Sequence, residues 1–77
     1  MKKIIDDLLY DTETAKLIYE DSKGRHMRLF YMTENKHYFC VYANGHFEPM
    51  TEQAVKGLLG EVDVDKYLEL FPSPKKA

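Results

Sequence analysis

Residues 26–43, HMRLFYMTENKHYFCVYA, decide the fold of this chain. Two runs rich in tyrosine, phenylalanine and methionine, 26–33 and 36–43, lie on either side of Glu34-Asn35. Such runs around a short polar pair are typical of antiparallel strands joined by a tight turn. We therefore predict a central β-hairpin at about 26–43, whose turn is Glu34-Asn35 with or without Lys36. A two-residue turn places Tyr31 opposite Tyr38.

This register gives the hairpin two apolar faces, because side chains alternate along each strand. One is a tyrosine face, with Leu29, Tyr31, Tyr38 and Tyr42 accompanied by Met27 and Cys40. The other carries the core candidates Phe30, Met32, Phe39 and Val41. A slip of one residue exchanges the faces, so the assignment depends on the turn. The tyrosine face either packs beneath the N-terminal segment and first helix, or is a surface for a partner or a second copy.

Further strands are predicted on both sides of this hairpin. Residues 3–10 indicate a short hairpin or bent strand around Asp6-Asp7. Asn44-Gly45 is a strong turn signal, and it predicts a third short strand over 46–48 that Pro49 ends.

Three helices are predicted from their capping residues. The first begins at Asp11 or Thr12 and ends over 21–24, with Gly24 as the C-cap. The second covers 52–59 between Thr51 and Gly60. The third begins at Asp63, and its apolar stripe consists of Val64, Tyr67, Leu68 and Phe71. These elements predict one α+β domain over 1–77, with a small antiparallel sheet packed by about three short helices and a flexible tail at about 72–77.

Composition indicates a cytoplasmic protein. Cys40 is the only cysteine, which excludes a disulfide within the chain and suggests a reducing compartment. The apolar stretches are too short for a secretion signal or a membrane span.

Charge is unevenly distributed, and this supports two kinds of partner. The hairpin region is basic, and Arg25, Arg28 and Lys36 among its aromatic residues suggest a nucleic-acid-binding surface. The flanking segments are acidic, and their carboxylates, Asp63 and Asp65 among them, suit a basic groove on another protein. The sequence pI of about 5.9 favours the protein partner, because nucleic-acid-binding domains are usually basic.

No catalytic or metal constellation emerges from the residues. His26, His37, His46 and Cys40 are the candidate zinc ligands, but they lack the usual ligand spacing. Along one strand, His37 and Cys40 point to opposite faces, which also argues against a nucleophilic pair. The four glycines are dispersed and form no phosphate-binding loop. We therefore expect neither a cofactor nor an enzymatic activity.

Several motifs resemble those of a family of small Firmicutes proteins from mobile elements and phages. They are YDTETA at 10–15, FYMT at 30–33 with YF at 38–39, and PMTEQA at 49–54, in the family's order. Some relatives act as anti-CRISPR inhibitors of type II effector nucleases. The chain departs from the pattern at Asp6-Asp7, where asparagine and glycine are usual, at the central turn, which lacks the usual glycine and leaves Asn35 as the expected left-handed residue, and at 63–71, which has no counterpart.

Together these observations predict a non-enzymatic inhibitor or adaptor that binds a host defence nuclease in the bacterial cytoplasm. The predicted partner-binding residues are Leu29, Tyr31, Tyr38, Tyr42, Asp63 and Asp65. The alternatives are a small nucleic-acid-binding module that uses Arg25, Arg28 and Lys36, and a homodimeric structural module.

Overall fold

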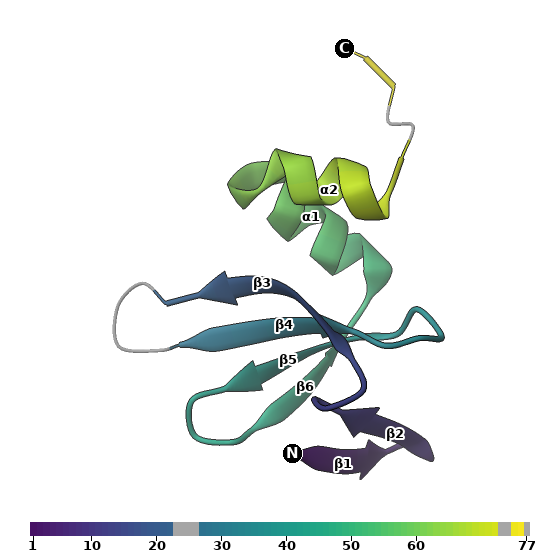
Figure 1. Cartoon of the computed structure of the whole chain (residues 1–77), viewed down its shortest axis with the longest axis vertical. Coiled ribbons are helices and arrows are strands. Elements are labelled where there is room, and N and C mark those ends of the chain that lie inside the picture. Colours follow the sequence, from purple (N-terminus) through teal and green to yellow (C-terminus); the bar gives the residue numbers. More distant parts are fainter. Residues whose placement is uncertain (23–26, 73–74, 77) are drawn as a thin grey trace.

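The computed structural model describes residues 1–22, 27–72 and 75–76, which form six strands and two helices. The elements in chain order are β1 (Lys2–Ile5), β2 (Leu8–Asp11), β3 (Lys16–Asp21), β4 (Arg28–Met32), β5 (Tyr38–Tyr42), β6 (Phe47–Met50), α1 (Glu52–Val62) and α2 (Val64–Leu70). A two-stranded antiparallel sheet, β1-β2, accompanies a four-stranded antiparallel sheet in the order β3-β4-β5-β6 (Figure 1). The predicted α+β class with a small antiparallel sheet is confirmed.

The N-terminal hairpin forms where the sequence predicted one, over slightly wider bounds. Asp6 and Asp7 are the two loop residues between the paired Ile5 and Leu8, and both have positive φ, 52° and 64°. Two consecutive left-handed residues give the two-residue turn whose twist matches that of paired strands. Aspartate tolerates this conformation better than most residues do, so Asp6-Asp7 replaces the more usual glycine-containing pair.

The first predicted helix is wrong, because residues 16–21 form β3 instead. The Asp11 side chain behaves as the cap it resembles, since its Oδ1 accepts a hydrogen bond from the Glu13 N–H at 3.0 Å. The Asp11 carbonyl also accepts one from the Ala15 N–H. These bonds close an isolated turn, after which the chain continues as a strand. Gly24, the predicted C-cap, lies outside the described residues.

The central hairpin forms as predicted, but its register differs by one residue. Tyr31 pairs with Phe39 and Met32 with Tyr38, because the turn has three residues rather than two. Lys36 donates its N–H to the Thr33 carbonyl, and the Thr33 N–H donates to His37. The left-handed residue is Lys36, with φ of 63°, and not Asn35. This is the three-residue loop in which a type I turn is followed by a left-handed residue.

The β5–β6 loop has the same hydrogen-bond pattern, with Gly45 at φ of 88° in the left-handed position. The third strand is longer than predicted, since β6 continues through Pro49 to Met50. Because β6 is the edge strand, the missing N–H of Pro49 removes no bond that the sheet requires.

Two helices follow β6, and their N-caps are those predicted. Thr51 Oγ1 accepts the Ala54 N–H, and Asp63 Oδ1 accepts the Lys66 N–H, each at 3.1 Å. The C-terminal bound of α1 was predicted too early, because the helix passes Gly60 and ends at Val62. Asp63 closes α1 through its own N–H and caps α2 with its side chain.

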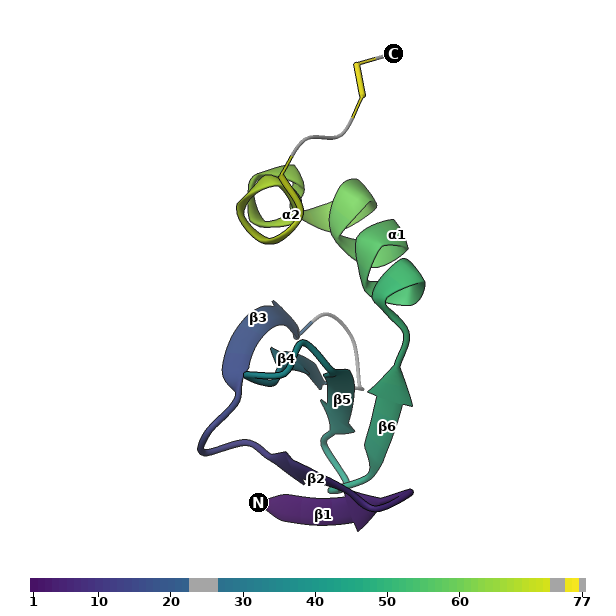
Figure 2. The same ribbon diagram turned by 90° about the vertical axis from the view of Figure 1, so that its right-hand side faces the viewer.

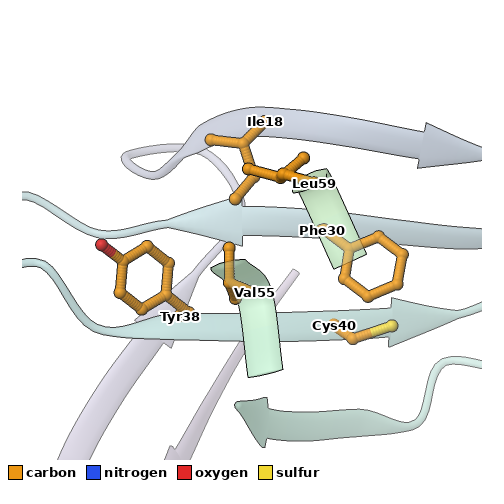
Figure 3. Packing of buried hydrophobic residues seen from close by; sticks show 6 residues of the cluster. All are labelled: Ile18, Phe30, Tyr38, Cys40, Val55 and Leu59. Carbon is orange, nitrogen blue, oxygen red and sulfur yellow. The ribbon is translucent and has the colours of Figure 1, made fainter. Parts of the chain in front are cut away.

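The four-stranded sheet lies between α1-α2 on one side and the β1-β2 hairpin on the other (Figure 2). The helix-side cluster consists of Ile18, Phe30, Tyr38, Cys40, Val55 and Leu59 (Figure 3). The hairpin-side cluster consists of Tyr10, Phe39, Val41 and Phe47. Both faces of the sheet are therefore covered, and the four predicted core residues divide between them.

Candidate functional site

The predicted tyrosine face does not exist as one surface, because the shifted register divides its members between the two sides of the sheet. Tyr31 lies on the hairpin side, half-buried and stacked on Phe39 with 5.1 Å between ring centroids. Leu29, also half-buried, pairs there with Val41. Tyr38 is buried on the helix side, where its ring lies 6.0 Å from that of Phe71. The assignment of these four residues to one face is corrected accordingly.

Tyr42 also lies on the helix side of the sheet, at the end of the sheet where charged side chains gather. Its hydroxyl donates a hydrogen bond to the Glu48 carboxylate, and this bond is the main reason that the pKa of Tyr42 is raised. Tyr42 pairs across β4 and β5 with Arg28, whose guanidinium forms a 2.7 Å ion pair with Asp21. The structure thus brings together one residue of the predicted protein-binding set and one of the nucleic-acid-binding set.

The basic residues proposed for nucleic acid do not gather in the part of the chain that the structure describes. Arg28 is engaged by Asp21, and the hydrogen bond between them raises the pKa of Arg28. Lys36 lies in the β4–β5 loop, at the opposite end of the hairpin from Arg28. Arg25 lies outside the described residues. Nothing in this arrangement favours the nucleic-acid alternative.

The two predicted acidic site residues flank the start of α2. Asp63 is half-buried and serves as a cap, whereas Asp65 is exposed in the first helical turn. Glu69, one further turn along, accepts a 2.7 Å hydrogen bond from Lys66, which lowers the pKa of Glu69. Asp65 is thus the freely exposed one of the two.

Within residues 1–22, 27–72 and 75–76, no three histidine, cysteine or acidic side chains come close enough to hold a metal ion. Cys40 is buried in the helix-side cluster, and burial raises the pKa of its thiol to about 11. The described helices are also too short to cross a membrane.

One groove, of about 410 Å³, lies between the sheet and α2. Its apolar wall includes Met32, Tyr38 and Phe71. Its rim carries both signs of charge, with Lys16 Nζ 3.8 Å from Glu69 Oε2. Because the rim is neither mainly positive nor mainly negative, the groove indicates no particular class of ligand.

The N-terminal hairpin presents the most coherent surface. Ile4 and Leu9 are direct cross-strand partners whose side chains are 70% and 58% exposed, and neighbouring Leu8 is 40% exposed. Tyr10 points the other way and is buried, with its ring 5.2 Å from that of Phe39. A second groove, of about 370 Å³, runs beside β2 and is lined by Leu8, Leu9, Thr14, Thr33, Glu34 and Asn35.

Charge around this surface is mainly negative, although Lys2 of β1 lies on the same face as Ile4 and pairs with Asp11. The chain from residue 4 to residue 15 carries Asp6, Asp7, Asp11 and Glu13 and no lysine, arginine or histidine. Glu34 adds a fifth carboxylate on the far wall of the groove, where it is exposed. The candidate site, called here the β2 surface, therefore consists of Ile4 and Leu9 on the outer face of the hairpin, with these five acids nearby, and of Leu8, which points to the opposite face and lines the groove.

Sequence reasoning predicted this hairpin but did not select its apolar residues as a site. A signal was present, because Ile4-Ile5 and Leu8-Leu9 each place two apolar residues side by side in a strand. Neighbouring residues in a strand point to opposite faces, so one of each pair must face away from whatever the other covers.

Comparisons of this chain with protein-family models, with curated proteins and with solved structures find no match. The proposals below therefore rest on the residues and their geometry, together with the motif resemblance described above.

Proposed function

We propose that this protein is a non-enzymatic, protein-binding inhibitor or adaptor of the kind that mobile elements and phages carry into the bacterial cytoplasm. The observation that carries the proposal is the exposed Ile4–Leu9 pair, with the acids Asp6, Asp7, Asp11 and Glu13 near it in the chain. Contiguous exposed apolar side chains with a polar rim are characteristic of interaction sites. Carboxylates around them steer a basic partner and add to the rate of association.

The motif resemblance suggests the first partner to test, a type II CRISPR effector nuclease. Such a nuclease holds nucleic acid in a positively charged channel. An acidic surface with an apolar centre complements a channel of that kind. In this proposal the protein occupies part of the channel and prevents productive DNA binding.

The test measures binding to a purified type II effector with its guide RNA, and cleavage of a target duplex. We expect a complex and reduced cleavage. We expect Leu9→Asp to weaken the complex and to restore cleavage, because it places a negative charge where an apolar contact is needed. Val64→Asp is the matched control, since Val64 is a similarly exposed side chain on α2, at 55%. An absence of binding together with undiminished cleavage would overturn the nuclease as partner.

A homodimer is the second candidate, because the same exposed apolar pair could be covered by another copy of the chain. Light scattering at high protein concentration distinguishes the two. A monomer at every concentration removes the homodimer, whereas a dimer that Leu9→Asp dissociates supports it.

A further inference from the structure

The backbone of β2 has an open edge at the centre of the β2 surface. The Thr12 N–H donates to the Met1 carbonyl at 2.9 Å, so Met1 and Thr12 form a hydrogen-bonded pair. Hydrogen-bonded and non-hydrogen-bonded pairs alternate along an antiparallel ladder. Ile4 and Leu9, three positions further in, are therefore a non-hydrogen-bonded pair. The N–H and carbonyl of Leu9 consequently point away from β1.

No strand in the described part of the chain pairs with this edge, although the Asp11 carbonyl, two residues along it, accepts the Ala15 N–H. The β1-β2 sheet has two strands only, and none of the loop and turn backbone hydrogen bonds involves Leu9. The space beside the edge is the groove whose far wall is formed by Thr14, Thr33 and Glu34. An unpaired strand edge beside open space is a template for another strand.

The chemistry around the edge selects the kind of strand. Leu9 and Ile4 offer apolar area on the outer face of the hairpin, and Glu34 offers a carboxylate inside the groove. Successive side chains of an added strand alternate between those two environments. The complementary sequence therefore alternates apolar residues with lysine or arginine. A second β2 does not fit, because it would bring Asp11 and its neighbouring acids against those of the first.

We propose that an extended, alternating basic and apolar segment of the partner protein adds to the open edge of β2 as a third strand. The inference rests on the proposed function, for which it supplies the mode of binding. Main-chain hydrogen bonds to Leu9 give affinity that does not depend on side chains, and the acids give specificity for charge.

The experiment uses a fluorescent, end-blocked octapeptide that alternates lysine and valine, with binding followed by anisotropy at low salt. The same peptide with glutamate in place of lysine tests charge. A third peptide, N-methylated at every residue, keeps every side chain but has no N–H to donate to a strand. We expect binding of the first peptide only, weakened by added salt because the charges are exposed.

Leu9→Pro removes the outward N–H of β2 without removing a bond of the hairpin. We expect it to weaken the lysine peptide about tenfold, which corresponds to the loss of about one hydrogen bond. Lys2→Pro is the matched control, because Lys2 lies in a non-hydrogen-bonded pair and its N–H points outward from β1. We expect that variant to bind the peptide unchanged. Glu34→Lys leaves the strand intact and should weaken binding of the lysine peptide.

Three outcomes overturn the proposal. The first is equal binding of the N-methylated and unmodified peptides, a result that does not depend on how Leu9→Pro folds. The second is concentration-dependent association of the protein alone that Leu9→Pro abolishes, which assigns the edge to a second copy. The third is a nuclease complex that Leu9→Pro leaves unchanged, which refutes strand addition but leaves the proposed function standing. Peptide binding through Leu9 without nuclease binding supports the edge site and refutes the nuclease.

Discussion

The two faces of the four-stranded sheet are covered in different ways. On the helix side, Val55 and Leu59 of α1 are 1% and 0% exposed and reach into a cluster contributed by three strands. On the hairpin side, Tyr10 is the one fully buried residue that β1 and β2 contribute to the cluster. Helices therefore cover their face with several side chains, whereas the hairpin is anchored mainly by one aromatic ring.

This difference explains where apolar surface remains. A strand has side chains on both faces, so the hairpin that buries Tyr10 must present Ile4 and Leu9 to the outside. The residues that hold the hairpin and the residues proposed to bind a partner are thus neighbours in β2. Substitutions on the two faces of the sheet test this contrast through their effects on the stability of the fold.

Phe39→Ala should cost the most, because three rings surround Phe39 on the hairpin side. The ring centroids of Tyr10, Tyr31 and Phe47 lie 5.2, 5.1 and 5.6 Å from that of Phe39. We expect the free energy of unfolding to fall by about 3–5 kcal/mol in urea titrations. Leu17→Ala, at a side chain that is 45% exposed, is the control and should change it by less than about 0.5 kcal/mol. Equal losses in the two variants would contradict the packing described.

Leu59→Ala probes the helix side in the same way. Leu59 is fully buried, so we expect a loss of about 2–5 kcal/mol, while Val62→Ala at the exposed end of α1 should be nearly neutral. In this variant, amide hydrogen exchange should be accelerated more in α1 than in β2, relative to the unsubstituted protein. Acceleration confined to β2 would mean that the two covering layers are not independent.

Cys40 gives a prediction in pH for the helix side. Because burial raises the pKa of its thiol from 9.0 to about 11, protonated Cys40 favours the folded state below pH 9. That contribution is lost as pH rises from about 9 to about 11. Alkylation by iodoacetamide at pH 8 should be about a hundredfold slower in the folded than in the unfolded protein, because the thiolate reacts. Cys40→Ala should flatten the dependence of stability on pH across this range, and an unchanged slope would refute the assignment.

The smallest expected effects belong to the two matched loops that set the register of the sheet. Lys36→Gly should stabilise the protein by about 1 kcal/mol, because a side chain at positive φ is strained. Gly45→Ala should destabilise it by about the same amount, for the converse reason. A Cβ at Gly45 would meet the Met1 side chain at an ordinary 3.6 Å, so the cost lies in the backbone. Thermal unfolding midpoints that move in the same direction for both variants would contradict this view.

Local signals predicted much of the fold. Asp6-Asp7, Asn44-Gly45, Thr51 and Asp63 each act within a few residues, and each forms the turn or cap expected. Asp11 shows the limit of such signals. Its capping oxygen is satisfied equally by an isolated turn, and only the pairing of β3 with β4 decides between helix and strand.

The candidate site was harder to predict, because it depends on register. Whether Tyr31 and Tyr38 share a face is decided by one loop residue, and the sequence favoured Asn35 over Lys36 for the left-handed position. The β2 surface depends instead on which side of a hairpin meets the sheet. That is a long-range choice made by Tyr10 and Phe39, which are far apart in the sequence.

The edge strands of the two sheets differ in how they resist edge-to-edge pairing with other copies of the protein. In β6, Pro49 lacks an N–H, and in β3 the pairing with β4 is irregular between Leu17 and Tyr19. Both features are known to discourage edge-to-edge aggregation, and lysines such as Lys2 and Lys3 do the same for β1. The Leu8–Asp11 strand carries no proline, lysine or irregularity. Its protection is negative charge, because a second β2 would bring Asp11 and its neighbouring acids against those of the first. Concentrated samples should therefore stay dispersed, and replacing Asp7 and Asp11 by asparagine should make them aggregate.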